Sequence, residues 1–183
     1  MAQKPRILER RLVAETRIFR VEQLDLAFSN GSRRCFERLL SGPGSVLVVP
    51  LRDANTLLLT REYAAGTDRY ELGFPKGIVE EGEDVLEAAN RELQEEVGYA
   101  ARELHLLQGV TLAPGYIQHR TSLVLARDLY ERSAEGDEPE PIEVVSWNLH
   151  DLDALLTRED FSEARSIAAL YLTRRRLEQE RNQ

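Results

Sequence analysis

Three glutamates near the end of one predicted helix are the residues of this chain best suited to carry out chemistry. Glu92, Glu95 and Glu96 fall on one face of a helix expected over about Val85–Val97, and Glu92 and Glu96 are spaced i, i+4. Like charges at that spacing cost about 0.2–0.5 kcal/mol. The negative end of the helix dipole disfavours them further, and no Lys lies four residues beyond any of them to offset this. Mg²⁺ and Mn²⁺ prefer such oxygen ligands and commonly join carboxylates to substrate phosphates, so the cluster favours a metal site over a merely solvated acidic face.

The predicted helix has a second face that fixes its orientation. Leu86, Ala89, Leu93 and Val97 recur at about 100° per residue, so this stripe is expected to face the core and to leave the glutamates elsewhere on the surface. Gly98 is a usual residue just past a helix end and is expected to stop it. The segment before the helix, residues 64–84, contains four glycines and Pro75 and reads as a loop that could bring a substrate close.

The net charge of the chain argues against one class of partner, long nucleic acid. The 183 residues include 24 basic and 32 acidic side chains, a formal net charge of −8. Tight binding to long nucleic acid needs many Lys and Arg contacts with phosphates, so such a partner is not expected. A phosphorylated substrate would need local neutralisation, which a divalent cation supplies. There is no apolar run of about 20 residues, and Cys35 is the only cysteine, so no internal disulfide can form. We expect a cytoplasmic protein that does not enter a membrane.

The elements that position the cluster are expected to be strands with interspersed helices. Alternating apolar residues on either side of Asn30-Gly31 predict an N-terminal β-hairpin, and Ser41-Gly42-Pro43-Gly44 reads as a linker after it. Two buried strands that flank Asp53-Ala54-Asn55 predict a second hairpin. This mixture indicates an α/β or α+β sandwich. Further strands are expected at residues 104–112, 122–126 and 142–147, and further helices at 151–156 and 162–180.

One motif is specific enough to suggest a family. Gly77, five residues, Glu83, seven residues, and then Arg91-Glu92-Leu93-Gln94-Glu95-Glu96-Val97-Gly98-Tyr99 resemble the Nudix box at every defined position. The resemblance covers roughly residues 44–183 and implies the Nudix fold, an α/β/α sandwich with a mixed sheet. Within the family the chain is especially similar to bacterial hydrolases of ADP compounds, and this similarity includes the N-terminal hairpin. The expected organisation is therefore a hairpin and dimerisation segment at residues 1–43 and a Nudix domain at residues 44–183.

The resemblance assigns roles to individual residues. Glu92, Glu95 and Glu96 are implied ligands of Mg²⁺ or Mn²⁺, and Glu96 is also implied as a catalytic residue. The carbonyl group of Lys76 is a further implied ligand. Four residues are implied to support the box: Gly77, where a close backbone approach is needed, and Glu83, Arg91 and Gly98.

Two features beyond the box bear on the reaction. Pro114 lies fifteen residues after Tyr99, as in the ADP-ribose-cleaving branch. The entry to the box, Phe74-Pro75-Lys76-Gly77, departs from the Pro-Ala-Gly of that branch, and Ile117-Gln118-His119 stand where an acid is usual. These departures fit a broader specificity for ADP-X compounds. An acidic loop before a late strand supplies the general base in related enzymes, which implies Glu138 as the base or a water-orienting residue and Glu140 as an additional ligand.

The expected activity is metal-dependent hydrolysis of ADP-ribose, NADH or diadenosine polyphosphates with release of AMP. The expected substrate contacts are Arg61, Arg69 and Arg34 for phosphate, and Tyr63, Tyr70, Phe74 and Tyr116 for stacking on adenine. The resemblance also implies a homodimer. Two alternatives stay open: hydrolysis of another nucleoside diphosphate derivative, such as a nucleotide sugar, and a non-catalytic nucleotide-binding regulator.

Overall fold

The computed structural model describes residues 3–182 and divides the chain into two compact units. Of the described residues, the first unit contains 3–42 and 111–120, and the second contains 43–110 and 121–182. Between residues 3 and 182, no helix combines the length and the apolar character that crossing a bilayer requires.

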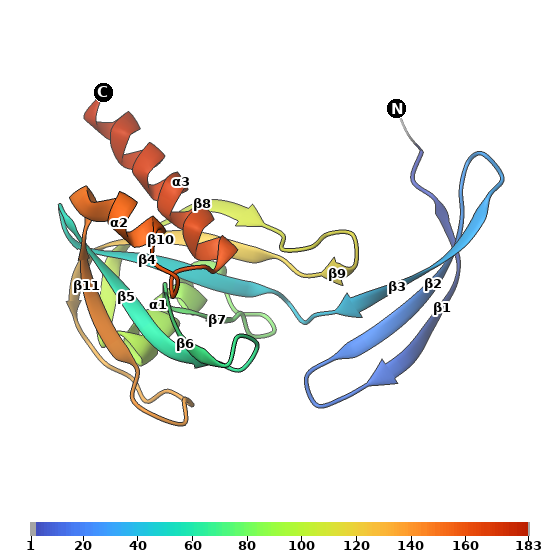
Figure 1. Ribbon diagram of the computed structural model, residues 1–183, viewed down its shortest axis with the longest axis horizontal. Coiled ribbons are helices and arrows are strands. Elements are labelled where there is room, and N and C mark those ends of the chain that lie inside the picture. Colours follow the sequence, from blue (N-terminus) through green and yellow to red (C-terminus); the bar gives the residue numbers. More distant parts are fainter. Residues whose placement is uncertain (1–2, 183) are drawn as a thin grey trace. The chain divides into compact units, whose positions relative to one another are not determined.

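The first unit is a sheet of four strands in the order β1-β2-β3-β9 (Figure 1). β1 (Arg6–Glu15) pairs antiparallel with β2 (Arg20–Ala27), which pairs antiparallel with β3 (Arg33–Leu40). The β2–β3 turn contains Gly31 at a φ of 83°, a conformation that glycine adopts without strain. This hairpin was predicted, but the prediction missed β1 and missed the short strand β9 (Ile117–Gln118), which pairs with β3.

The second unit is built on a mixed sheet in the order β11-β5-β4-β10-β8. At its centre β4 (Ser45–Asp53) runs parallel to β10 (Thr121–Glu131), whose other neighbour β8 (Tyr99–Val110) is antiparallel. On the other side β5 (Thr56–Ala64) pairs antiparallel with β4 and with β11 (Glu143–Asn148). Two short strands lie off this path: β6 (Arg69–Gly73) pairs with β5, and β7 (Lys76–Ile78) pairs with β4.

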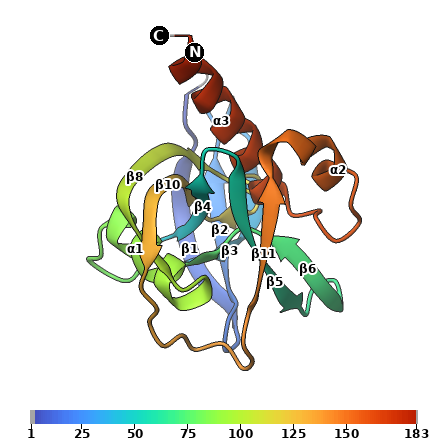
Figure 2. The ribbon, with the colours of Figure 1, turned by 90° about the vertical axis from the view of Figure 1, so that its left-hand side faces the viewer.

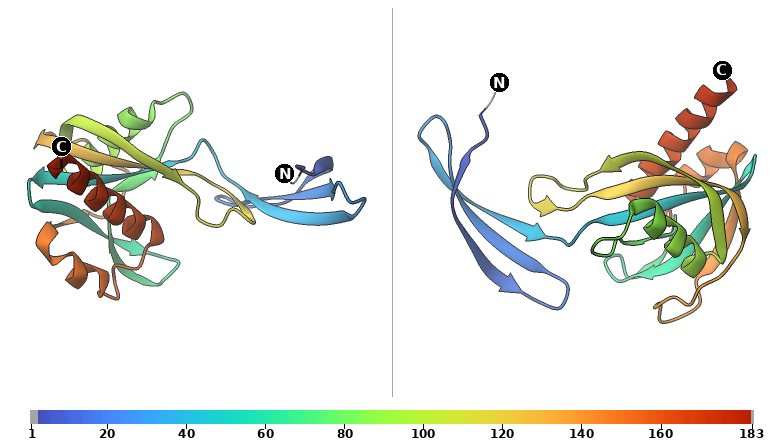
Figure 3. Two further views of the ribbon diagram at one scale, coloured as in Figure 1. Left: turned by 90° about the horizontal axis from the view of Figure 1, so that it is seen from above. Right: turned by 180° about the vertical axis from the view of Figure 1, so that it is seen from behind.

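Alternation along β4 builds one hydrophobic core on each face of this sheet. Leu47, Val49 and Leu51 face one core, whereas Val46 and Val48 face the other. The first core is covered by α2 (Leu152–Leu156) and α3 (Ala164–Arg181), and the second by α1 (Val85–Glu96), so helices lie on both faces of the sheet (Figures 2 and 3). A short 3-10 helix, η1 (Leu149–Asp151), precedes α2. The predicted α/β/α sandwich with a mixed sheet is confirmed.

Local signals set the ends of α1. The Asp84 side chain accepts a hydrogen bond from the backbone N–H of Leu86 at 2.8 Å and caps the first turn. The helix ends at Glu96 with Val97 as its C-cap, and Gly98 follows with a φ of 78°. The prediction for this helix therefore agrees with the structure within one residue. The prediction of a loop over residues 64–84 was wrong in part, because β6 and β7 lie within it.

Candidate active site

The packing of Gly77 against α1 brings one carboxylate of the glutamate cluster onto the backbone of β7. A Cβ atom at Gly77 would lie 2.0 Å from Oε1 and 2.2 Å from Oε2 of Glu92. Real Cβ contacts are never this short, so only glycine lets the Glu92 side chain occupy this place. Glu92 is 6% exposed, and its pKa is raised by burial and by the nearby charges of Glu95 and Glu138.

Glu96 lies deepest in the cluster and has one carboxylate oxygen without a partner. Its residue is 5% exposed, and Oε1 accepts a hydrogen bond from the backbone N–H of Lys76 at 3.1 Å. Oε2 is buried and has no hydrogen-bond partner among the described residues. Burial raises the pKa of Glu96 to about 8, although the neighbouring Lys76 opposes the shift. A buried, unsatisfied carboxylate oxygen is costly, and a cation is the ligand that would satisfy it.

Arg91 neutralises the cluster from within the same helix. One of its terminal nitrogens, Nη1, donates to Glu92 at 2.7 Å and to Glu95 at 3.0 Å. Its Nε donates to Glu83 at 3.0 Å, and Nη2 donates to the carbonyl of Ile78 at 2.9 Å. The sequence argument looked for an offsetting cation four residues after each glutamate, but the structure places it four residues before Glu95. Arg91 thus ties the loop before α1 to the glutamates of α1.

The acidic loop that follows β10 is anchored to the end of α1. The backbone N–H of Ala134 donates to the carbonyl of Gln94 at 3.1 Å, and that of Arg132 donates to the carbonyl of Gly98 at 3.1 Å. These bonds bring Glu135, Asp137 and Glu138 to the same cleft as the glutamates of α1. The cleft has a volume of about 780 Å³. Its remaining lining includes Glu62, Lys76, Gly77, Ile78, Glu80, Arg91, Glu92, Glu95, Glu96, Gly136 and Pro139.

The donor set of this cleft fits a hard divalent cation. Carboxylates of Glu92, Glu95 and Glu96 line it, and the free oxygen of Glu96 is unsatisfied. Within residues 3–182, no three Asp, Glu, His or Cys side chains are already arranged as a metal-binding group. In this arrangement the Arg91 guanidinium binds the carboxylates of Glu92 and Glu95, so a bound cation would compete with Arg91 for their oxygens.

Several predicted substrate contacts lie outside this cleft. Arg61 is ion-paired with Asp160 at 2.7 Å and with Glu143 at 3.0 Å. Arg69 donates to Glu71 at 2.9 Å and to the carbonyl of Glu159 at 2.6 Å. Both guanidinium groups are therefore engaged by acids or carbonyls of their own surroundings.

Of the predicted aromatic residues and acidic-loop residues, some line the cleft and others do not. Phe74 is fully buried and packs edge-on against Phe161, so it offers no face to a ligand and its prediction as a stacking residue was wrong. Tyr70 donates to Glu140 at 2.6 Å, and Glu140 does not line the cleft, whereas its neighbour Glu138 does. Arg34 and Tyr116 belong to the first unit.

Sequence reasoning missed an ion pair in the lining of the cleft, between the carboxylate of Glu62 and the ammonium of Lys76. Lys76 had been singled out for its carbonyl alone, yet its Nζ forms an ion pair with Glu62 at 2.8 Å. Glu62 lies in β5, three residues after the end of the apolar run Leu57 to Leu59. An acid at the end of a buried strand was the available signal, but only the arrangement of β5, β6 and β7 brings it to Lys76.

Replacing Gly77 by Ala tests the close approach of Glu92. The new Cβ would force the Glu92 carboxylate away, and Arg91 holds that carboxylate in place, so we expect kcat/KM to fall by roughly 100-fold. Gly42→Ala is the matched control, because a Cβ at Gly42 meets no atom within 4 Å and Gly42 does not line the cleft. Steady-state kinetics of both variants, with urea unfolding to verify the fold, decides the point. Equal activity of the two variants would contradict the role of the close approach.

Comparison with known proteins agrees with this geometry. The NUDIX domain model matches residues 43–170, and the model of the NudE-type Nudix hydrolase N-terminal domain matches residues 5–38. The chain is 50% identical to the ADP compounds hydrolase NudE of Escherichia coli (strain K12) over 94% of this chain and 92% of that protein. It is 28% identical to the ADP-ribose pyrophosphatase of Bacillus subtilis (strain 168), with 89% and 91% covered.

A solved structure of an ADP compounds hydrolase superposes with a TM-score of 0.93 at 48% identity and covers 98% of this chain and 97% of that chain. Nudix hydrolases generally need divalent metal ions, which agrees with the carboxylates around Glu96. The box of Gly77 to Tyr99, the sandwich that carries it and these matches lead to one conclusion: the chain belongs to the Nudix family and is a Nudix hydrolase.

Proposed function

We propose that this chain hydrolyses the diphosphate linkage of ADP-X compounds and releases AMP. With ADP-ribose, the oxygen of a water molecule would bond to one phosphorus, the bridging P–O bond would break, and AMP and ribose 5-phosphate would leave. The observation that carries the proposal is the acidic cleft in which Glu92, Glu95 and Glu96 face the loop of Glu138. The choice of ADP compounds is supported by the similarity to the hydrolase of Escherichia coli over nearly the whole chain.

In this proposal Glu92, Glu95, Glu96 and the carbonyl of Lys76 hold Mg²⁺ or Mn²⁺, which supplies Lewis-acid activation of water and of the diphosphate. The protein supplies the rest. Arg91 holds the glutamate side chains of α1 in place by hydrogen bonds, and Gly77 leaves room for the Glu92 carboxylate beside β7. The Lys76 ammonium adds positive charge at the cleft wall, where the transition state spreads negative charge over phosphate oxygens.

Glu138 is the proposed general base, because it lines the cleft and its charge acts on Glu92. Glu138→Gln is expected to lower kcat by about 10²- to 10⁴-fold, the usual contribution of a positioned base. Glu140→Gln is the matched control two residues away, and its carboxylate is bound to Tyr70 instead. We expect Glu140→Gln to keep kcat within about threefold, since the amide oxygen can still accept the hydrogen bond from Tyr70 and only an exposed charge is removed. A larger loss in Glu140→Gln than in Glu138→Gln would transfer the role to Glu140.

A substrate panel tests the proposed class. ADP-ribose, NADH, diadenosine triphosphate and GDP-mannose would each be incubated with Mg²⁺ or Mn²⁺, and the nucleotide products separated by chromatography. AMP from the three adenosine compounds, with GDP-mannose intact, is the expected result. Cleavage of GDP-mannose alone would assign the chain to nucleotide sugars. Tight binding of ADP-ribose without turnover of any compound would indicate a non-catalytic regulator.

Three further expectations stay predictions. We expect the chain to form a homodimer, to be cytoplasmic, and to contact its substrate through Arg34, Arg61, Arg69, Tyr63 and Tyr116.

A further inference from the structure

A second cavity adjoins the acidic cleft within the same unit. It has a volume of about 400 Å³ and lies between the β5–β6 hairpin and the start of α3. Tyr63, Ala64 and Leu72 line it from β5 and β6, and Ser162 and Ser166 line it from the segment that leads into α3 and from α3 itself. A volume of this size accommodates a group as large as a substituted sugar.

Two residues, Lys76 and Glu62, line both cavities, and their side chains form an ion pair. The charged atoms of this pair are 2.8 Å apart. The same Lys76 donates its backbone N–H to Glu96, the deepest carboxylate of the cleft. A molecule that reaches from one cavity to the other therefore passes beside Lys76, close to Glu96.

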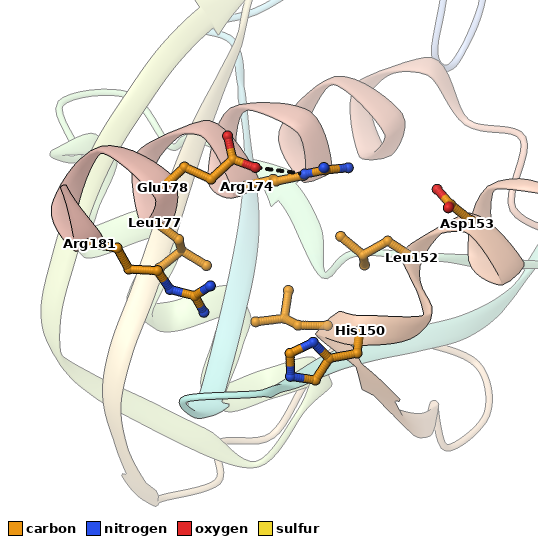
Figure 4. A pocket seen from close by; sticks show the side chains of 8 residues that line it. His150, Leu152, Asp153, Arg174, Leu177, Glu178 and Arg181 are labelled. Carbon is orange, nitrogen blue, oxygen red and sulfur yellow. Dashed lines mark hydrogen bonds and ion pairs between the residues drawn. The ribbon is translucent and has the colours of Figure 1, made fainter.

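The cavity between η1–α2 and the end of α3 has no lining residue in common with the acidic cleft (Figure 4). It has a volume of about 310 Å³, and His150, Asp153, Arg174 and Arg181 line it together with Glu178, which is ion-paired with Arg174 at 2.9 Å. The second cavity is therefore the one whose position relates to the diphosphate chemistry.

The lining of the second cavity suits a ligand rich in hydroxyl groups. Hydroxyls of Thr60, Thr67, Ser162 and Ser166 line it. The carboxylates of Glu62, Glu71 and Glu163 line it as well, ion-paired with Lys76, Arg69 and Arg165 respectively. A carboxylate in an ion pair keeps lone pairs that can accept hydrogen bonds from sugar hydroxyls. Its one aromatic ring, that of Tyr63, is 48% exposed, and its hydroxyl already donates to Asp68 at 2.7 Å. A flat purine would find a single half-exposed ring, whereas a sugar would find acceptors on several sides.

We propose that the second cavity binds the sugar of the X group, the part of an ADP-X substrate beyond the diphosphate that is not adenosine. The diphosphate lies in the acidic cleft, and the chain of atoms to the sugar passes beside Lys76. This proposal rests on the proposed function. It predicts that the cavity lining at Ala64 and Ser162 determines which X groups the chain accepts.

Filling the cavity from either of these positions tests the proposal. Ala64→Trp adds a large side chain from the end of β5, and Ser162→Trp adds one from the segment that leads into α3, so a folding defect in one variant does not end the test. Ala54→Trp is the control, because Ala54 is exposed in the β4–β5 turn and lines neither cavity. For ADP-ribose we expect KM to rise at least about tenfold in both cavity variants with kcat within about twofold, since binding alone is removed. The control is expected to match the wild type.

Inhibition by the two reaction products shows which part of the substrate the second cavity binds. As competitive inhibitors of ADP-ribose hydrolysis, ribose 5-phosphate should weaken about tenfold in Ala64→Trp and Ser162→Trp, and AMP should be unchanged. An unchanged KM in two folded variants would overturn the proposal, and so would weaker inhibition by AMP with unchanged inhibition by ribose 5-phosphate. AMP release by the wild type tests the proposed function, whereas the difference between variants tests the cavity, so the two failures are distinguishable.

Discussion

Glu96→Gln is expected to lower kcat by more than about 100-fold and, at the same time, to stabilise the metal-free protein. Replacing partners that only support metal ligands typically costs 10- to 100-fold, so about 100-fold is a lower limit for a ligand itself. The stability gain has a separate cause. The Glu96 carboxylate is 5% exposed with one oxygen unsatisfied, and an amide avoids the cost of burying a charge there.

The same change should alter the dependence of stability on pH. The pKa of Glu96 is raised from 4.5 to about 8 in the folded chain, so the unfolded chain loses this proton at a lower pH than the folded chain does. Ionisation therefore favours unfolding, and stability should fall between about pH 4.5 and pH 8 by several kcal/mol in the metal-free wild type. Glu96→Gln should remove most of this slope.

Urea unfolding between pH 5 and pH 8.5 in a chelator, beside activity assays, checks both effects. Glu131→Gln removes an exposed carboxylate on β10 and should leave the slope and kcat as in the wild type. A Glu96→Gln variant that is inactive and also less stable at pH 8 would indicate a structural defect and count against the assignment.

Arg91→Lys is the second change with a large expected effect. The Arg91 guanidinium bridges Glu83, Glu92, Glu95 and the carbonyl of Ile78, and these acids raise its pKa. A lysine keeps the charge, but its single ammonium cannot reach the loop and the helix glutamates with the same forked geometry. Because the carboxylates left behind are largely buried, we expect a loss of about 3 kcal/mol in stability and a fall of roughly 100-fold in kcat/KM.

Arg102→Lys is the matched control for this substitution. The Arg102 guanidinium pairs with Asp128 at 3.1 Å, but both side chains are more than half exposed, so the change should cost less than about 1 kcal/mol. Urea unfolding and kinetics of both variants separate the two sites. Similar stability of Arg91→Lys and Arg102→Lys would contradict the bridging role of Arg91.

The central helix of the site was predictable because its signals are local. The apolar stripe from Leu86 to Val97 and the stop at Gly98 lie within about four turns of chain and act together. The same holds for the buried strands on either side of Asn55, whose apolar runs are unambiguous. The box residues then followed from a motif with many defined positions.

Other parts depended on contacts between distant residues. β1 mixes charged residues with apolar ones in no regular alternation, so no pattern marked it, and its partners in β2 alone define it as a strand. β6 and β7 lie among glycines and Pro75, and they are strands because β5 and β4 supply their hydrogen bonds. The Lys76–Glu62 pair joins residues fourteen positions apart, and the second cavity joins β5 to α3. None of these is visible in a short window of sequence.

The most direct test of the account is AMP release from ADP-ribose by the purified chain under three conditions in sequence: with Mg²⁺, after addition of a chelator, and after Mg²⁺ is restored. We expect AMP and ribose 5-phosphate in equal amounts in the first condition, none in the second, and recovery in the third. Release of AMP that continues at the same rate in the chelator would contradict a metal-dependent site built on Glu92, Glu95 and Glu96. So would the absence of AMP in all three conditions.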